Sequence, residues 1–210
     1  MMRVFRKSEL SDTLNYILLF EVLLTLVDGP KYIREVAAAM TNRRGLVLIA
    51  DLLKNARRRN LVLRVNDPKH PKWDLTDLGL TLLESHLDCP NLCEIHLHQR
   101  IALIEKTKAD LRNIYALNHL VRICVLERLL AAPEGLTERE LSDLIPASLR
   151  PGKLLDELRA LFAYRMIEVR DAVHARGKLS YAITGAGKGS LSLLIRMRAS
   201  TGAASDRRCL

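Results

Sequence analysis

The sequence predicts a mainly α-helical protein with two small β-hairpins, in which one architecture occurs twice. Apolar residues make up 49% and charged residues 27% of its 210 residues, a balance typical of globular domains. Aromatic residues are only 4%, and the apolar content is mostly Leu, Ile, Val and Ala, which favours helices packed on helices. The stretch KWDLTDLGLTLLESH (72–86) is followed 108 positions later by SYAITGAGKGSLSLL (180–194), with the same order of Thr, two residues, Gly and a leucine-rich segment.

In the first half, helices are expected at 14–27, 31–40, 46–60 and 77–86, and short strands at 61–65 and 72–76 around the turn NDPKHP. The first helix, with Ser11 or Asp12 as N-cap, resembles a signal peptide in its apolar run. Glu21 interrupts that run, and the run is too short for a membrane span, so we expect a buried helix. In the third helix, Asn60 fits a left-handed C-cap.

The second half repeats this order of elements. Helices are expected at 117–131 and 136–145, and a third follows the turn that contains Pro151. Thr137 is placed as an N-cap, with Glu140 at the capping-box position. The stretch from 167 to 184 is expected to form two strands around a Gly-containing turn, before a closing helix. The pattern therefore indicates an internal duplication of architecture.

Three helices and a basic hairpin closed by LTxxGxxLL resemble the winged helix-turn-helix, notably the MarR-like and PadR-like bacterial regulators. The matching residues are Leu75, Thr76, Gly79 and Leu83, and again Ile183, Thr184, Gly187 and Leu191. Arg165 departs from the pattern, since many family members have Gly where the third helix meets the wing. The implied fold class is mainly α with small β-hairpin wings. Its expected parts are a winged-helix domain at 1–86, a helical linker at 87–116, a second winged-helix domain at 117–198 and a flexible tail at 199–210.

The charge distribution predicts a polyanionic partner. Lys and Arg exceed Asp and Glu by nine, and the pI is about 9.7. Nine basic residues face two acidic ones between Arg43 and Lys72, whereas Glu9 to Glu35 holds two basic and five acidic residues. The basic stretch coincides with the third helix and wing, which contact DNA in the winged-helix family. We therefore expect a sequence-specific double-stranded DNA-binding regulator.

The resemblance assigns roles to individual residues. Side chains at the start of the third helix are expected to reach base edges, and those farther along it and on the wing to contact phosphates. The first set is Asn42, Arg43 and Arg44, and the second is Lys54, Arg57, Arg58, Arg59, Arg64, Lys69, His70 and Lys72. In the second half, the stretch from Ser148 to Lys178 has seven basic and four acidic residues, and the candidates there are Ser148, Arg150, Lys153, Arg170, His174, Arg176 and Lys178. The alternative is that Arg57, Arg58 and Arg59 only solvate an exposed helix end.

No catalytic arrangement is found, so the chain is not expected to be an enzyme, and no cofactor is expected. TGAGKGS (184–190) lacks the Gly spacing of a phosphate-binding loop. HLDCPNLCEIHLH (86–98) leaves two alternatives to a capped linker, a zinc site or a thiol redox switch at Cys89 and Cys93. The zinc ligands would come from His86, Cys89, Cys93, His96 and His98. The four scattered cysteines indicate a reducing cytoplasm, and the resemblance to bacterial regulators implies the bacterial cytoplasm or nucleoid.

The partners expected from the sequence are double-stranded DNA and a second copy of the chain, with no membrane contact. Candidate homodimer surfaces are the 14–27 helix and the 90–115 linker helix, which carries a heptad stripe from Leu97 to Tyr115. Two other functions remain open. Tandem winged helices also resemble the kleisin-interacting subunits of chromosome-organising (SMC-type) complexes, which bind proteins, and plasmid or phage replication initiators. A protein adaptor need not concentrate arginine on the third helix.

Overall fold

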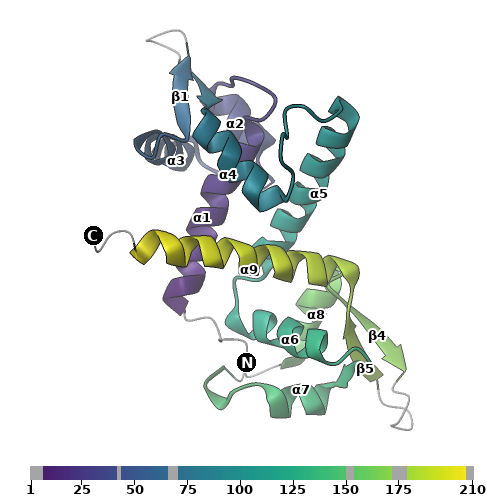
Figure 1. The fold of residues 1–210 in the computed structure, drawn as a ribbon. Helices are drawn as coiled ribbons and strands as arrows, with labels where there is room; N and C mark the ends of the chain where they lie inside the picture. Colours follow the sequence, from purple (N-terminus) through teal and green to yellow (C-terminus); the bar gives the residue numbers. More distant parts are fainter. Residues whose placement is uncertain (1–6, 42–43, 66–70, 150–153, 172–178, 207–210) are drawn as a thin grey trace. The chain divides into compact units, whose positions relative to one another are not determined.

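The computed structural model describes residues 7–41, 44–65, 71–149, 154–171 and 179–206. The chain is mainly helical, with two small antiparallel sheets, as expected (Figure 1). The helices are α1 (Lys7–Thr25), α2 (Ile33–Ala39), α3 (Leu46–Arg58), α4 (Asp77–Leu87), α5 (Leu97–Ala116), α6 (Leu120–Ala131), α7 (Glu138–Leu144), the 3₁₀ turn η1 (Ala147–Leu149), α8 (Leu154–Ala163) and α9 (Gly185–Asp206). The strands are β1 (Val62–Val65), β2 (Lys72–Leu75), β3 (Leu136–Thr137), β4 (Ile167–Asp171) and β5 (Leu179–Ile183).

The chain divides into two compact units, one formed by 15–112 and the other by 1–14 with 113–210. The boundaries fall inside α1 and α5. The stretch 87–116, expected as a separate linker, is therefore shared between the two units. The segment from 199, expected as a flexible tail, continues α9 as helix to Asp206.

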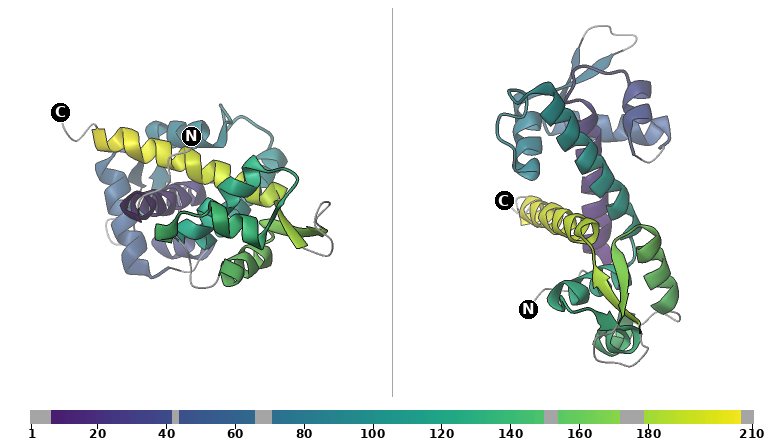
Figure 2. Two further views of the ribbon diagram at one scale, coloured as in Figure 1. Left: turned by 90° about the horizontal axis from the view of Figure 1, so that it is seen from below. Right: turned by 90° about the vertical axis from the view of Figure 1, so that its right-hand side faces the viewer.

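In the 15–112 unit, α1, α2, α3 and α4 surround a core and the β1–β2 hairpin projects beyond them (Figures 1 and 2). The strands pair in antiparallel register, with Val62 opposite Leu75, and an isolated bridge between Lys31 and Trp73 extends the pairing. The core is built from fully buried side chains of the helices, including Ile17, Phe20, Leu23, Val36, Ile49, Leu53 and Leu83.

The apolar run of the first helix is buried, as predicted. Every residue from Leu19 to Val27 is buried, which leaves little of this helix for the homodimer contact that the sequence suggested. The helix begins at Lys7, before the caps expected at Ser11 or Asp12. Among the described residues, no helix combines the length and apolar character needed to cross a bilayer.

In the unit completed by 113–210, α6, α7 and α8 pack beside a three-stranded sheet in the order β3-β5-β4. Thr137 and Glu140 form the predicted capping box: the Thr137 N–H donates to the Glu140 carboxylate at 2.7 Å, and the Glu140 N–H donates to the Thr137 hydroxyl at 3.3 Å. An ion pair of 2.6 Å between Arg122 and Glu157 joins α6 to α8.

The duplication extends to individual hydrogen bonds where each hairpin ends. The Thr76 hydroxyl donates to the Asn60 carbonyl at 2.6 Å and accepts from the Gly79 N–H at 3.1 Å. The Thr184 hydroxyl donates to the Arg165 carbonyl at 2.6 Å and accepts from the Gly187 N–H at 3.1 Å. The repeated Thr and Gly of the sequence thus perform the same local task twice, as helix N-cap and as tie to the end of the third helix.

Glycine is required in this closure because the backbone of the closing helix approaches the start of the hairpin. A Cβ atom on Gly79 would lie 2.1 Å from the Leu61 carbonyl oxygen, and one on Gly187 would lie 2.2 Å from that of Met166. The residue before each carbonyl has a left-handed backbone, with φ of 57° at Asn60 and 55° at Arg165. The prediction for Asn60 is confirmed, and Arg165 adopts the same conformation without the Gly found in many winged helices.

Candidate nucleic-acid interface

Several described basic residues of the 15–112 unit lie on α3, directly after it and on the adjoining hairpin, while others lie around α2 and on α5. α3 is amphipathic, since Ile49, Leu53 and Ala56 are buried while the basic residues in its C-terminal half are exposed. We call Lys54, Arg57, Arg58, Arg59, Arg64 and Lys72 the α3–hairpin surface.

The arginines at the end of α3 are available to an external anion. Arg57, Arg58 and Arg59 are all exposed, and within the described ranges none of them forms a salt bridge. Lys54 differs, because its ammonium lies 3.3 Å from the Asp51 carboxylate, with both side chains more than half exposed. Three neighbouring guanidinium groups, which have no acidic partner among the described residues, make this helix end positively charged, as a contact with phosphates requires.

On the hairpin, aromatic rings hold two cations in place. The Arg64 guanidinium lies 4.9 Å from the centre of the Trp73 ring, directly across the strand pair. The Lys72 ammonium lies 4.9 Å from the centre of the Tyr32 ring. Cation–π contact orders a long side chain while its charge still faces outward. Both cations are therefore positioned before any ligand binds.

The start of α3 differs from the sequence-based expectation. Asn42 and Arg43 lie outside the described residues, and Arg44 is half-buried, with its Nε atom fully covered. Thr41 directly precedes these residues and binds Glu21. The buried Glu21 carboxylate accepts hydrogen bonds from the Thr41 backbone N–H and, at 2.6 Å, from the Thr41 hydroxyl. Base reading by Arg44 stays a prediction.

The first turn of α3 presents an apolar surface that sequence reasoning missed. Val47 is 78% exposed, Leu46 is 42% exposed and Leu48 is 41% exposed. A signal was available, because four successive apolar residues, Leu46 to Ile49, cannot all lie on one face of a helix. Ile49 faces the core, so Val47, two positions earlier, points to the opposite side of the helix.

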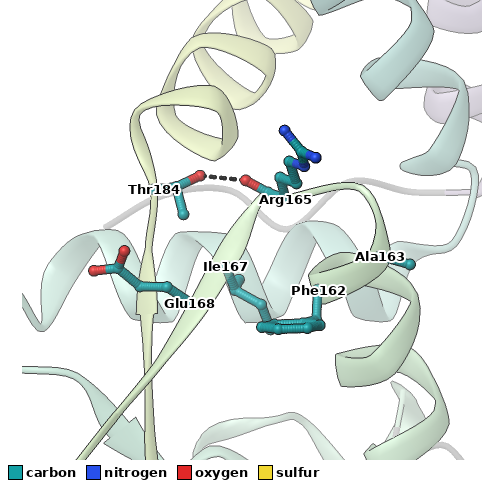
Figure 3. A pocket seen from close by; sticks show the side chains of 6 residues that line it. All are labelled: Phe162, Ala163, Arg165, Ile167, Glu168 and Thr184. Atoms are coloured by element: carbon teal, nitrogen blue, oxygen red, sulfur yellow. Dashed lines mark hydrogen bonds between the residues drawn. The ribbon is translucent and has the colours of Figure 1, made fainter.

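The second copy has different chemistry at the corresponding helix end. Phe162, Ala163 and Tyr164 each lie 105 positions after Arg57, Arg58 and Arg59 and are likewise exposed. A hollow of about 410 Å³ opens here, in which Phe162 and Ile167 point toward one another and Arg165 points away (Figure 3). Ala163, Glu168 and Thr184 complete its lining. These aromatic side chains were not among the site residues predicted from the sequence.

Few of the predicted DNA-contacting residues of the second copy can be located. Ser148 is exposed in η1, and the Arg170 guanidinium is bound to the Glu168 carboxylate through Nε at 2.7 Å. The remaining candidates lie outside the described residues: Arg150, Lys153, His174, Arg176 and Lys178, and in the first copy Lys69 and His70. The one located cation is thus already paired with an acid.

The possible zinc ligands are not assembled. Among the described residues, no three His, Cys, Asp or Glu side chains could hold a metal ion together. His86 is buried, with its ring centre 5.7 Å from that of Tyr16 and 5.5 Å from that of Phe20. Its Nδ1 lies 2.8 Å from the Leu82 carbonyl oxygen. His86 is therefore part of the core of its unit rather than a ligand awaiting metal.

The other candidates of that segment have different surroundings. His96 and His98 stack on each other with ring centres 5.8 Å apart, and Cys89 and Cys93 are free thiols.

The heptad stripe of α5 is divided between interior and surface. Ile104 and Leu111 are buried, whereas Leu97 is 59% and Ile101 49% exposed.

A scan against protein-family models, a search of curated proteins and a search of solved structures each found no match to this chain.

Proposed function

We propose that this chain is a double-stranded DNA-binding protein built as a tandem winged helix. Its main DNA contact is the α3–hairpin surface. The observation that carries the proposal is the end of α3, where Arg57, Arg58 and Arg59 are exposed and form no salt bridge among the described residues. The role that best fits is a sequence-specific transcription regulator of the cytoplasm or nucleoid.

Physical chemistry supports this partner. Each phosphate neutralised by Lys or Arg releases condensed counterions, which gives affinity that falls steeply with salt. An α-helix also fits the major groove of B-DNA, which is about 12 Å wide. The hairpin next to α3 adds Arg64 and Lys72, which the Trp73 and Tyr32 rings hold in place. A helix with a flanking basic hairpin could therefore contact a groove and its phosphates together.

The two copies are not expected to contribute equally. Phe162, Ala163 and Tyr164 replace the arginines in the second copy, and Arg170 is paired with Glu168. The first copy should therefore supply most of the phosphate contacts.

The test compares two variants of equal net charge. In one, Arg57, Arg58 and Arg59 become Gln. In the other, the exposed Lys106, Arg112 and Arg139 become Gln. Binding to a short random-sequence duplex is measured by fluorescence anisotropy over a range of salt concentrations.

We expect the first variant to bind at least about tenfold more weakly at physiological salt. The slope of log affinity against log salt should lose about 2.7, because each phosphate contact accounts for about 0.9. The second variant should change affinity by less than about twofold. Equal losses in both variants, or a wild-type chain that does not bind duplex DNA, would contradict the proposal.

One observation favours a second candidate, a tandem winged-helix subunit that binds proteins in a chromosome-organising complex. Exposed apolar side chains occur at the third helix of both copies, at Val47 in the first and at Phe162 and Tyr164 in the second. A wild-type chain that fails to bind DNA, together with a dedicated partner whose binding is lost on Phe162→Ala and Tyr164→Ala, would favour this function. A replication initiator would instead be recognised by repeated rather than palindromic sites among selected DNA sequences.

A further inference from the structure

The outward face of α3 changes chemistry along its length. Val47, Asp51, Asn55 and Arg58 follow one another at helical spacing and are all exposed. The face therefore begins with an apolar side chain, continues with polar ones and ends with the arginines. Asp51 adds little repulsion toward an anion, since Lys54 lies 3.3 Å from it.

Val47 is the most exposed large apolar side chain among the described residues, at 78%. Leu46 and Leu48 flank it at 42% and 41% exposure, so the first turn of α3 offers water a continuous apolar surface. The surface is confined to the first copy. The sequence has Pro151, Gly152 and Lys153 at the positions that correspond to Leu46, Val47 and Leu48. The architecture that the two copies share therefore does not require the apolar first turn of α3.

We propose that Val47 contacts the C5-methyl group of thymine in the major groove, and so makes the protein prefer thymine at the base facing the first turn of α3. This inference rests on the proposed DNA-binding function. The thymine methyl is the apolar group that base edges display in the major groove, so it is the group that an exposed valine on a groove-bound helix can recognise.

The surrounding charge supports DNA over a protein as the occupant of this face. Arg57, Arg58 and Arg59 lie on the same helix, and Arg64 and Lys72 lie on the adjoining hairpin. A protein partner would need several carboxylates to match these cations, whereas every turn of duplex DNA carries phosphates on both sides of the groove. The apolar first turn and the basic remainder of the α3–hairpin surface thus fit the centre and the edges of one groove.

The experiment removes the methyl group from either side of the contact. Duplexes are first selected by the wild-type chain from a random library and sequenced, and each thymine of the selected site is then replaced singly by uracil, which lacks only that methyl. The protein variants are Val47→Ala and, as matched control, Val169→Ala, which truncates an exposed valine on β4 of the other unit. Because Ala favours helix and Val47 is exposed, Val47→Ala should fold normally, which thermal unfolding verifies.

With the wild-type chain, uracil at one or two positions should weaken binding about threefold to fivefold, the value of one buried methyl group. Val47→Ala should weaken binding to the thymine site by a similar factor and lose the sensitivity to uracil. Val169→Ala should keep that sensitivity.

Each contrary result has a distinct meaning. A wild-type chain that binds no duplex overturns the proposed function itself. Binding that is equal for thymine and uracil at every position overturns only the thymine inference. A uracil penalty that persists unchanged in Val47→Ala removes Val47 from the contact.

Discussion

The last turn of α3 ends in Arg57, Arg58 and Arg59, whereas the corresponding turn of α8 leads into Phe162, Ala163 and Tyr164. The backbone around the two ends is the same. Both are followed by a left-handed residue, and both are tied to the closing helix through a threonine hydroxyl at 2.6 Å. The two ends therefore share these hydrogen bonds and backbone conformations but carry different outward side chains. The activity of one copy therefore cannot be assigned to the other from shared architecture.

The largest expected effect tests whether the two closures are equally essential. Replacing Gly79 or Gly187 by Ala places a Cβ atom about 2 Å from a backbone oxygen, which neither helix can avoid without moving. We expect each variant to lose about 3 kcal/mol of unfolding free energy, measured by urea denaturation. Gly185→Ala is the control, since its Cβ would meet open space, and it should change stability by less than about 0.5 kcal/mol. Tolerance of Ala at Gly79 but not at Gly187 would show that the copies close differently.

A smaller effect concerns the ion pair between Arg122 and Glu157 in the second copy, which the first copy lacks at the corresponding position. Burial acts to raise the pKa of Glu157, but hydrogen bonds from Arg122 and His119 outweigh it and lower that pKa. The position corresponding to Glu157 in the first copy is Leu52. We expect Glu157→Gln to cost about 2 kcal/mol of stability at neutral pH.

The lowered pKa sets how this effect depends on pH. A carboxyl group whose pKa falls on folding stabilises the protein above its unfolded pKa, about 4.3, and loses that contribution as the pH falls through the lower folded value. The difference between wild type and Glu157→Gln should therefore shrink below about pH 4.3 in urea-denaturation series. The loss caused by Leu52→Ala in the first copy should stay constant with pH. A constant loss for Glu157→Gln would mean that packing, rather than charge, provides its contribution.

The smallest effect would be a gain of function in the second copy. Phe162→Arg with Tyr164→Arg restores two cations at the positions that hold Arg57 and Arg59 in the first copy. If both copies approach the same duplex, affinity should rise about tenfold and the salt slope should steepen by about 1.8. Phe162→Gln with Tyr164→Gln, which removes the rings without adding charge, serves as control. Unchanged affinity in the arginine variant would mean that the second copy faces away from bound DNA.

Local patterns allowed most of the secondary structure to be predicted from sequence. Apolar periodicity and turn residues are short-range signals, so many helices and strands appear within a few residues of their expected places, and Asn60 and Thr137 adopt their predicted backbone roles. The exceptions are α5, which begins at Leu97 rather than at 90, and β3, which lies where a helix was expected. The predicted start of α1 was wrong. The helix already begins at Lys7, so Ser11 and Asp12, which were expected as caps, lie inside it.

The candidate site was less predictable, because it depends on which side chains the tertiary structure covers. Sequence spacing places His86 near Cys89, but the fold brings it to Tyr16, seventy positions away, and buries it. Glu21 reaches Thr41 in the same way, beside the helix start where base-reading residues were expected. The charge of α3 could be read from the sequence, whereas the exposure of Val47 and the partial burial of Arg44 required the packed core.

The strand pairing indicates where a hairpin of this kind can change in length. Val62 pairs with Leu75 and Ile167 with Ile183, so the second hairpin has three more residues while its first pair occupies the corresponding position. Since a slip of one residue would exchange the two faces of a strand, extra length is tolerated only at the far end, away from the threonine and glycine that fasten each hairpin. Insertions at that end would lengthen one hairpin, so that it could contact more distant surfaces than the other hairpin without changing the core.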